Sequence, residues 1–143
     1  MRVFLDANVL FSAAKSDGAV RELLRRLQAA GHVLVADAYV AGEARRNLAS
    51  KGASALDDLE ALLSGVVDVV AMVVTPPRAA SIDRVAATDL SWLPAKDQPV
   101  LAAAIRHRCE VLVTGDRAHF GAAYGQSFGG VTVHSPRSLF DTL

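Results

Sequence analysis

This chain of 143 residues is poor in several residue types, and each shortage argues against a class of protein. It has a single cysteine, Cys109, so no internal disulfide can form and nothing in its cysteine content indicates secretion. Aromatic residues make up only 6%, so extensive base stacking is not indicated. Charge of one sign is not in excess either, with 15 Lys and Arg against 15 Asp and Glu. The chain is therefore no polycation, and any binding of nucleic acid has to be local.

Long apolar runs are also missing. The longest is residues 66–74, which Asp68 interrupts, and it is far shorter than the roughly 20 residues that cross a bilayer. The N-terminus has no charged segment followed by an apolar one, because Asp6 and Asn8 break it. We therefore expect no membrane association and a cytoplasmic location.

The length and composition of the chain favour a single folded domain. At 143 residues the chain is expected to form a single domain over residues 1–143, large enough for a core without disulfides or a structural metal. The hydrophobic share of 52% is on the high side for such a domain. Some of this apolar surface is expected to be covered by a partner.

Short apolar runs alternate with helical patterns along the chain. The predicted strands are residues 2–5, 32–36, 66–74, 111–114 and 131–134. The predicted helices are residues 8–15, a second one capped by Asp17 and ending at Gly31, 38–49 capped by Asp37, 54–63, a short one between Pro77 and Ala87, 97–108, 117–124 and a last one from Ser135. Loops are expected at residues 88–95 and in the glycine-rich stretch up to Gly130. This alternation predicts a three-layer α/β/α sandwich with a mostly parallel central sheet.

Two aspartates follow predicted strands. Asp6 ends the strand 2–5, and Asp116 comes just after the strand 111–114. Ligands of open α/β sheets bind beyond the carboxyl ends of the strands, so both carboxylates are expected in one crevice. This requires the first and fourth strands to be neighbours. Taken singly, each aspartate is equally typical of a helix N-cap, and Asp97, two residues before Pro99, is more typical of a cap than of a site.

Glu43 is more informative because it lies inside a predicted helix, where it caps nothing. The residues of this helix expected to face the sheet are Val40, Ala44, Asn47 and Leu48. Glu43 lies at the edge of that face and near the N-terminal end of the helix, above the strand ends. The alternative is a half-exposed glutamate paired with Arg46 or Asn47.

Carboxylates gathered at one end of a sheet repel one another and need a positive partner. The partner that suits several carboxylate oxygens is a hard divalent cation, Mg²⁺ or Mn²⁺, as one or two ions. Such an arrangement is typical of phosphate chemistry.

Four motifs containing these residues occur in a particular order. They are Val3-Phe-Leu-Asp-Ala-Asn-Val-Leu, Val40-Ala-Gly-Glu-Ala-Arg-Arg-Asn-Leu, Lys96-Asp-Gln-Pro-Val-Leu-Ala-Ala-Ala and Leu112-Val-Thr-Gly-Asp-Arg-Ala-His-Phe. This order resembles the PIN domain, the nuclease fold of VapC-type toxins and of ribosome-processing and decay enzymes. The resemblance covers residues 2–120. It implies a catalytic and metal-binding quartet of Asp6, Glu43, Asp97 and Asp116, supported by Asn8 and Thr114.

The resemblance also implies an activity. A PIN domain would use Mg²⁺ or Mn²⁺ to hydrolyse RNA phosphodiester bonds, leaving a 5′-phosphate and a 3′-hydroxyl. A VapC-like toxin would have an antitoxin protein as partner and would form a homodimer. One departure concerns the second metal position. Many relatives carry a further acidic residue just after the last aspartate, whereas Asp116 is followed here by Arg-Ala-His-Phe.

Several basic residues are candidates for contacts with RNA phosphates. Those expected near the strand ends are Lys15, Arg45, Arg46, Lys96 and Arg117. His119 is one short helical step from Asp116 and could also touch phosphate. The alternative for each is a solvated surface charge. Tyr39 and Trp92 are possible stacking platforms or core residues.

Two other functions stay open on the sequence alone. One is a catalytically idle PIN-like module that binds RNA or protein. The other is a Mg²⁺-dependent phosphoacceptor or phosphatase domain, which also places an aspartate after its first strand. A phosphatase of the haloacid-dehalogenase type has Asp-x-Asp there, whereas position 8 of this chain is asparagine.

Overall fold

The computed structural model describes residues 1–70 and 84–143, and within them six strands form one sheet in the order β3-β2-β1-β4-β6-β5. The strand bounds are Arg2–Leu5 (β1), Val33–Asp37 (β2), Val67–Val70 (β3), Val111–Val113 (β4), Ser127–Phe128 (β5) and Val131–His134 (β6). β1 pairs in parallel with both β2 and β4. The predicted adjacency of the first and fourth strands is therefore confirmed.

The helices agree with the predicted order. Their bounds are Ala7–Lys15 (α1), Ala19–Ala29 (α2), Ala38–Leu48 (α3), Ala53–Gly65 (α4), Gln98–Arg106 (α5), Arg117–Phe120 (α6) and Pro136–Asp141 (α7), with single 3₁₀ turns at Ala49–Lys51 (η1) and Gly121–Ala123 (η2). None of the helices in the described part of the chain is long and apolar enough to cross a membrane.

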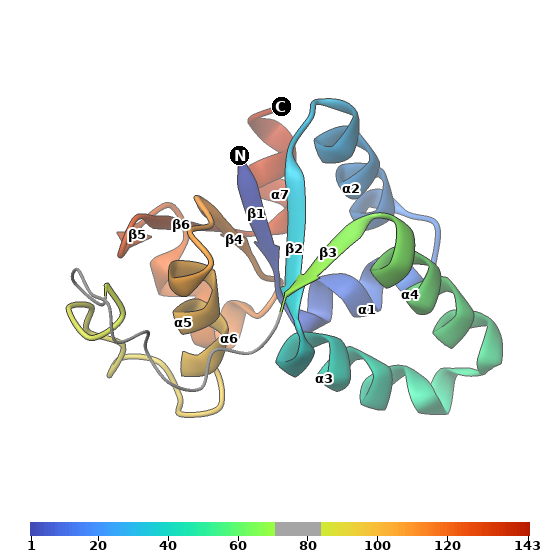
Figure 1. Ribbon diagram of the computed structural model, residues 1–143, viewed down its shortest axis with the longest axis horizontal. Helices are drawn as coiled ribbons and strands as arrows, with labels where there is room; N and C mark the ends of the chain where they lie inside the picture. Colours follow the sequence, from blue (N-terminus) through green and yellow to red (C-terminus); the bar gives the residue numbers. More distant parts are fainter. Residues whose placement is uncertain (71–83) are drawn as a thin grey trace.

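The sheet lies between two layers of helices (Figure 1). Helices α1 to α4 pack against one another on one side, and α5 and α6 lie on the other. The last helix, α7, packs against β6 and α2. All strand pairs are parallel except β5 with β6, so the predicted three-layer α/β/α sandwich with a mostly parallel sheet is confirmed.

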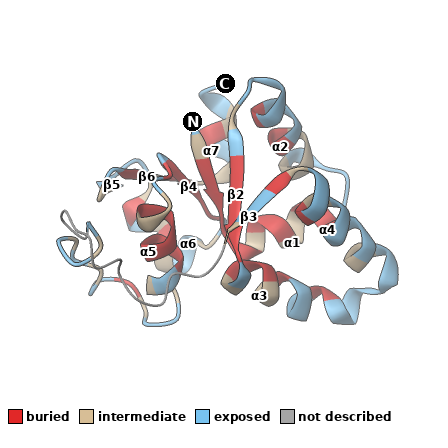
Figure 2. Cartoon of the chain, in the orientation of Figure 1, coloured by how far each residue is buried: buried red, intermediate tan, exposed pale blue. Residues whose placement is uncertain are grey.

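The core runs through the centre of this sheet, where Figure 2 shows the strands as mainly buried. Val3, Phe4 and Leu5 of β1 are all fully buried, although they point alternately to the two faces. Such a continuous apolar run is what a parallel strand needs when helices cover it on both sides. Burying each large apolar side chain stabilises the fold by roughly 1.5–3 kcal/mol, so β1 is a rigid support for the residue that follows it.

Capping residues decide where several helices begin. The Asp37 carboxylate accepts a hydrogen bond from the Val40 backbone N–H at 3.0 Å, so the predicted cap of α3 is confirmed. The predicted cap of α2 is wrong: Gly18 occupies the N-cap position without a side-chain bond. Asp17 lies one residue too early for that role, and its carboxylate instead pairs with Arg25 at 3.0 Å.

The remaining differences concern loops and the ends of elements. β3 is described over Val67–Val70, and Val66, the first residue of the predicted strand 66–74, instead ends α4. Residues 71–74 of that strand and most of the helix predicted before Ala87 lie outside the described residues. Residues 84–87 form turns. The prediction missed β5, which pairs antiparallel with β6 through a hairpin at Gly129 and Gly130. Both glycines have positive φ, 56° and 87°, as a tight two-residue hairpin requires.

Candidate active site

Asp6 lies where β1 ends and α1 begins, and its side chain is only 5% exposed. One carboxylate oxygen, Oδ1, accepts a hydrogen bond from the Ala7 backbone N–H at 2.7 Å. The other, Oδ2, accepts from the Thr114 hydroxyl at 2.8 Å and from the Asn8 side-chain amide at 3.2 Å. The Asp6 backbone N–H donates to the Val113 carbonyl at 3.1 Å, which links the ends of β1 and β4.

Thr114 and Asn8 extend this network to the segment that carries Asp116. The fully buried Thr114 hydroxyl also accepts from the Asp116 backbone N–H at 3.2 Å. The Asn8 Oδ1 atom accepts from the Gly115 backbone N–H at 2.8 Å, and a Cβ at Gly115 would come within 3.3 Å of that oxygen. Glycine is thus the residue that allows this close approach. Both predicted supporting residues contact Asp6.

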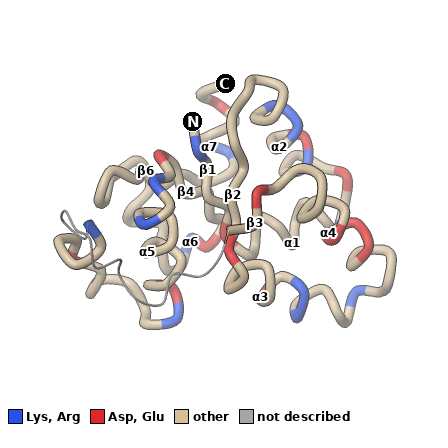
Figure 3. Tube along the Cα trace, in the orientation of Figure 1, with Lys and Arg blue, Asp and Glu red and all other residues tan. Residues whose placement is uncertain are grey.

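Two further carboxylates act on Asp6 through space. Burial raises the pKa of Asp6 from 3.8 to about 6, against the lowering effect of its hydrogen bonds from Thr114 and Ala7. The negative charges of Glu43 and Asp97 raise this pKa further. Burial, followed by the same two charges, also raises the pKa of Tyr39. Figure 3 shows acidic segments gathered at the ends of the central strands, between α3 and α6.

Asp97, Asp116 and His119 form the other half of the cluster. The Nδ1 atom of His119 lies 2.7 Å from Oδ2 of Asp97 and 2.9 Å from Oδ2 of Asp116. These contacts are short, but they do not have hydrogen-bond geometry. Among the described residues, Nδ1 of His119 and Oδ2 of Asp97 are buried atoms without a hydrogen-bond partner. Donor atoms of all three side chains lie within 4.8 Å of one another, which is close enough to share one cation.

Comparison with known proteins then supplies the family. The family model described as PIN domain matches residues 2–118. This chain belongs to the PIN domain family. The family predicted from the four motifs is therefore confirmed. The matched part contains Asp6, Glu43, Asp97 and Asp116, and His119 follows just after its last residue. No curated protein matches the chain by sequence.

Solved structures share this fold over nearly the whole PIN domain. VapBC2 from Rickettsia felis, bound to a DNA fragment from its promoter, has a TM-score of 0.65 and 13% identity over 94% of this chain and 98% of that one. VapC20 from Mycobacterium tuberculosis, a sarcin-ricin loop cleaving toxin, has a TM-score of 0.55 and 18% identity over 90% and 98%. FitAB bound to the IR36 DNA fragment has a TM-score of 0.53 and 20% identity over 94% of each chain.

The alternative roles considered for the four acidic residues of this PIN domain have different outcomes. Asp97 occupies the N-cap position of α5 but makes no side-chain capping bond, so the capping interpretation is wrong for it. Asp6 caps α1 and Asp116 caps α6 through the His119 backbone N–H at 3.2 Å, while both carboxylates also belong to the cluster. Glu43 is half-buried on α3, and its charge reaches Asp6 and Tyr39.

The face of α3 differs from the prediction in one residue. Val40, Ala44 and Leu48 are buried as expected, but Asn47 is exposed. It lies in the last turn of the helix, where a polar side chain can turn to solvent. The position of Glu43 does not depend on it, because Val40 and Ala44 on either side of Glu43 set that part of the face.

The basic candidates for RNA contacts are spread more widely than predicted. Lys96 and Arg117 are exposed and adjoin Asp97 and Asp116 in the chain. Lys15 is not near the strand ends: it lies at the far end of α1, about 12 Å along the helix from Ala7, with its ammonium 5.6 Å from the Phe11 ring.

Both arginines of α3 are exposed. The Arg45 guanidinium makes two bonds to the Glu60 carboxylate of α4, at 2.6 and 3.2 Å. Arg46 is close enough to Tyr39 for its charge to act on the tyrosine hydroxyl, so it is the one nearer to the acidic cluster.

The positions of two side chains were not evident from the sequence. The Tyr39 hydroxyl donates to the Lys96 carbonyl at 2.7 Å, which links the start of α3 to the segment just before Asp97. His119 was considered only for phosphate contact, yet it lies against two carboxylates. Its i,i+3 spacing from Asp116 on a short helix was the signal that places both on one face.

The ring of Trp92 packs against Phe128, with ring centroids 4.8 Å apart.

Removing the Thr114 hydroxyl should disturb the site from within. Thr114→Val keeps the side-chain shape but leaves Asp6 Oδ2 and the Asp116 N–H without this partner. We expect a loss of roughly 1–3 kcal/mol in the free energy of unfolding, measured by chemical denaturation. Thr132→Val is the matched control, because the Thr132 hydroxyl forms an exposed hydrogen bond with the Ser127 hydroxyl. Equal losses in both variants would contradict the buried network.

The raised pKa of Asp6 should make metal-free stability depend on pH. Because the folded pKa of about 6 exceeds the ordinary value of 3.8, folding favours the protonated acid. This stabilisation is complete below about pH 4 and is lost as pH rises through 6. A shift of about two pKa units corresponds to about 3 kcal/mol, so wild type should lose up to that amount relative to Asp6→Asn between pH 4 and pH 7. Parallel denaturation profiles in metal-free buffer would contradict the shift.

Proposed function

We propose that this PIN domain is a metal-dependent ribonuclease that hydrolyses RNA phosphodiester bonds and acts as the toxin of a toxin–antitoxin pair. The observation that carries the proposal is the convergence of four carboxylates from distant parts of the chain: Asp6, Glu43, Asp97 and Asp116. Asp6 follows β1, Glu43 lies on α3 after β2, Asp97 precedes α5 and Asp116 follows β4. The parallel pairing of β1 with β4 brings the ends of these two strands together.

The donor set fits a divalent cation. A carboxylate offers about four lone-pair positions, and Asp6 uses three of them for Ala7, Asn8 and Thr114, which leaves one directed elsewhere. Oδ2 of Asp97 is buried without a hydrogen bond among the described residues, so it too has capacity for a ligand. Burial is the main cause of the raised pKa of Asp6, and repulsion from Glu43 and Asp97 adds to it; a cation that binds among the carboxylates relieves both effects. We propose Mg²⁺ or Mn²⁺, as one or two ions.

The residues of the site would have different roles in the reaction. A bound cation supplies Lewis-acid chemistry, polarising the phosphate and making a bound water more acidic. Asp6, Asp97 and Asp116 would hold the cation, and Glu43 would either ligate it or orient the attacking water. Asn8 and Thr114 would keep Asp6 in place through the bonds described above. The attacking water oxygen would bond to phosphorus as the bond to O3′ breaks, giving a 5′-phosphate and a 3′-hydroxyl.

Exposed positive charges beside the acidic residues would hold the RNA backbone. Lys96 and Arg117 are the best placed of these, because each directly adjoins a residue of the quartet and is exposed. Arg46, in the last turn of the neighbouring helix α3, is proposed as a third contact. Their phosphate contacts would position RNA without reading its sequence.

The proposed partners follow from the same family. The similar structures include a toxin that cleaves the sarcin-ricin loop and two assemblies bound to DNA fragments, VapBC2 and FitAB. We propose by analogy that this chain forms a homodimer and binds a cognate antitoxin protein. Size measurement of the chain alone, and after co-expression with the gene next to its own, tests both partners.

The test of the activity is RNA cleavage by the purified chain. Total RNA is incubated with protein in Mg²⁺, in Mn²⁺ and in EDTA, and the ends of the products are determined. We expect fragments with 5′-phosphates in either metal and intact RNA in EDTA. Cleavage that continues in EDTA would contradict the proposal, and RNA that is bound but never cut would favour the idle binding module.

A further inference from the structure

We propose that Nδ1 of His119 is itself a metal ligand, and that this nitrogen makes the PIN domain bind Mn²⁺ in preference to Mg²⁺. The inference rests on the proposed function, because it concerns the ion that the same carboxylates would hold. It adds a ligand of a different chemical kind to the acidic quartet, and with it a stronger preference for Mn²⁺ than carboxylates alone would produce.

The distances around His119 agree with a shared ion. In octahedral coordination with bonds of about 2.1 Å, neighbouring ligand atoms are about 3.0 Å apart. Nδ1 of His119 lies 2.7 Å from Oδ2 of Asp97 and 2.9 Å from Oδ2 of Asp116. The three atoms are therefore spaced like neighbouring ligands of one ion. Asp97 comes from the start of α5, and Asp116 and His119 come from α6 and its N-cap.

An ordinary ion pair explains the arrangement less well. A histidine that bonds to a carboxylate directs a ring N–H at one oxygen, but the Nδ1 direction of His119 is aligned with neither. Within the described residues, this nitrogen and Oδ2 of Asp97 are both buried and both lack a hydrogen bond. Two facing polar atoms left in this way are unfavourable unless a third group binds them both. A cation is the group that accepts both kinds of donor.

The backbone holds His119 in this position. The Asp116 Oδ1 atom accepts a hydrogen bond from the His119 N–H at 3.2 Å, so one carboxylate both caps α6 and fixes the start of the histidine side chain. The other oxygen of the same carboxylate is the one that lies 2.9 Å from the ring. Asp116 and His119 thus reach the site as one unit, at i,i+3 spacing.

A nitrogen ligand changes which metal is favoured. Imidazole suits transition metals, whereas Mg²⁺ prefers oxygen throughout its shell. Mn²⁺ accepts carboxylate oxygens and an imidazole nitrogen together, so it should bind more tightly than Mg²⁺. Co²⁺ follows Mn²⁺ in the order of increasing affinity for such sites and should bind more tightly still.

The test measures metal binding without RNA. His119→Asn places a neutral oxygen close to the position of Nδ1, so it changes the ligand atom with little change in shape. Binding of MnCl₂ and of MgCl₂ is measured by titration calorimetry, and Mn²⁺-loaded protein is examined by pulsed electron paramagnetic resonance for coupling to a bound ¹⁴N. We expect the ¹⁴N signal only when His119 is present, and a preference for Mn²⁺ over Mg²⁺ that falls about tenfold in His119→Asn.

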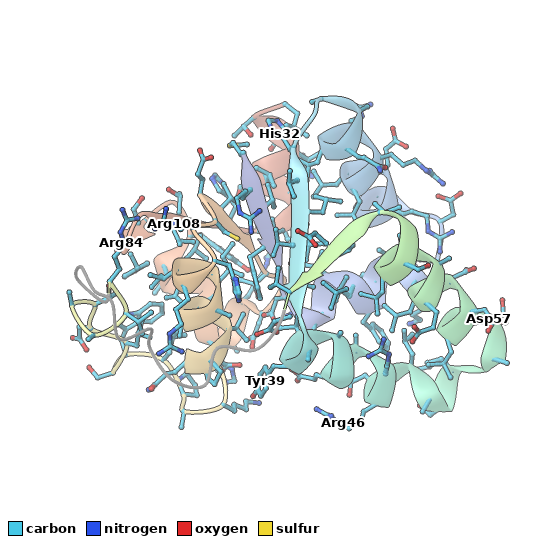
Figure 4. The ribbon with its side chains drawn as sticks, viewed as in Figure 1. His32, Tyr39, Arg46, Asp57, Arg84 and Arg108 are labelled. Carbon is cyan, nitrogen blue, oxygen red and sulfur yellow. The ribbon has the colours of Figure 1, made fainter. Side chains whose placement is uncertain are left out.

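His32→Asn is the matched control. His32 lies at the opposite end of the sheet from Tyr39 (Figure 4), with its Nδ1 atom 2.9 Å from the N-terminal amine. This variant should keep both the ¹⁴N signal and the wild-type metal preference.

The outcomes separate this inference from the proposed function. One result would overturn the role of His119 and leave the carboxylate site intact. In it, Asp6→Asn weakens Mn²⁺ binding, but wild type gives no ¹⁴N signal and His119→Asn keeps the wild-type metal preference. Binding of neither metal by wild type, or equal binding by wild type and Asp6→Asn, would overturn both.

Discussion

Asp6→Asn is expected to lower the rate of RNA cleavage by on the order of 10³-fold while leaving the fold intact, because it removes a charge from the centre of the proposed metal site. The Asp6 carboxylate receives three hydrogen bonds that aim it at the cluster. Asparagine can keep the bond from Ala7, so helix α1 still begins at the same residue. The loss should therefore appear in the rate at saturating RNA, measured with a fluorescently labelled strand.

The control for Asp6→Asn is the same change at an exposed carboxylate. Asp57 lies on α4, far from Tyr39 and the site (Figure 4). Asp57→Asn should cleave RNA at the wild-type rate, and circular dichroism should show both variants folded. A folded Asp6→Asn variant that retains wild-type activity would show that the cleavage arises elsewhere or from a contaminant.

The second large effect is on thermal stability. A ligand at 100 times its dissociation constant stabilises the folded state by about 2.7 kcal/mol when it binds only that state. For a chain of this size such a gain raises the melting temperature by roughly 5–10 °C. Saturating Mn²⁺ should raise the melting temperature of wild type by this amount, because a cation offsets the burial of the Asp6 charge and its repulsion by Glu43 and Asp97, which both raise the pKa of Asp6.

Asp97→Asn shows whether this gain comes from the site. Asp97 makes no capping bond, so its replacement should have little effect on α5 itself. Its Oδ2 atom is buried beside His119, so the variant should lose most of the stabilisation by Mn²⁺. An unchanged rise in melting temperature would mean that Asp97 does not bind the ion. Asp141→Asn, a carboxylate paired with Arg137 on the surface of α7, is the control.

Much of this site could be predicted because strand ends and ligand sites coincide in α/β sheets. Asp6 and Asp116 follow buried apolar runs, and the parallel pairing of β1 with β4 brings their ends together. Glu43 could be placed because helical periodicity gives its position relative to Val40 and Ala44, both of which are buried. These inferences needed only local patterns and one rule of topology.

Other features depend on tertiary contacts that no local pattern contains. Asp97 before Pro99 has the pattern of a helix cap, and only the packing of α5 against the rest of the site directs its carboxylate to His119 instead. Asp17 is of a residue type that often caps helices, but its carboxylate pairs with Arg25 instead. The strand β5 is two residues long, and its signal was the Gly129–Gly130 turn rather than any apolar run.

The central claim is that distant carboxylates converge to hold a divalent cation that cuts RNA. The most direct measurement is a map of 5′-phosphate ends in total cellular RNA after brief induction of wild type and, separately, of Asp6→Asn. We predict a set of new ends at defined positions with wild type that is missing with the variant. The same new ends in both samples, or no new ends with a folded and metal-bound wild type, would contradict the account.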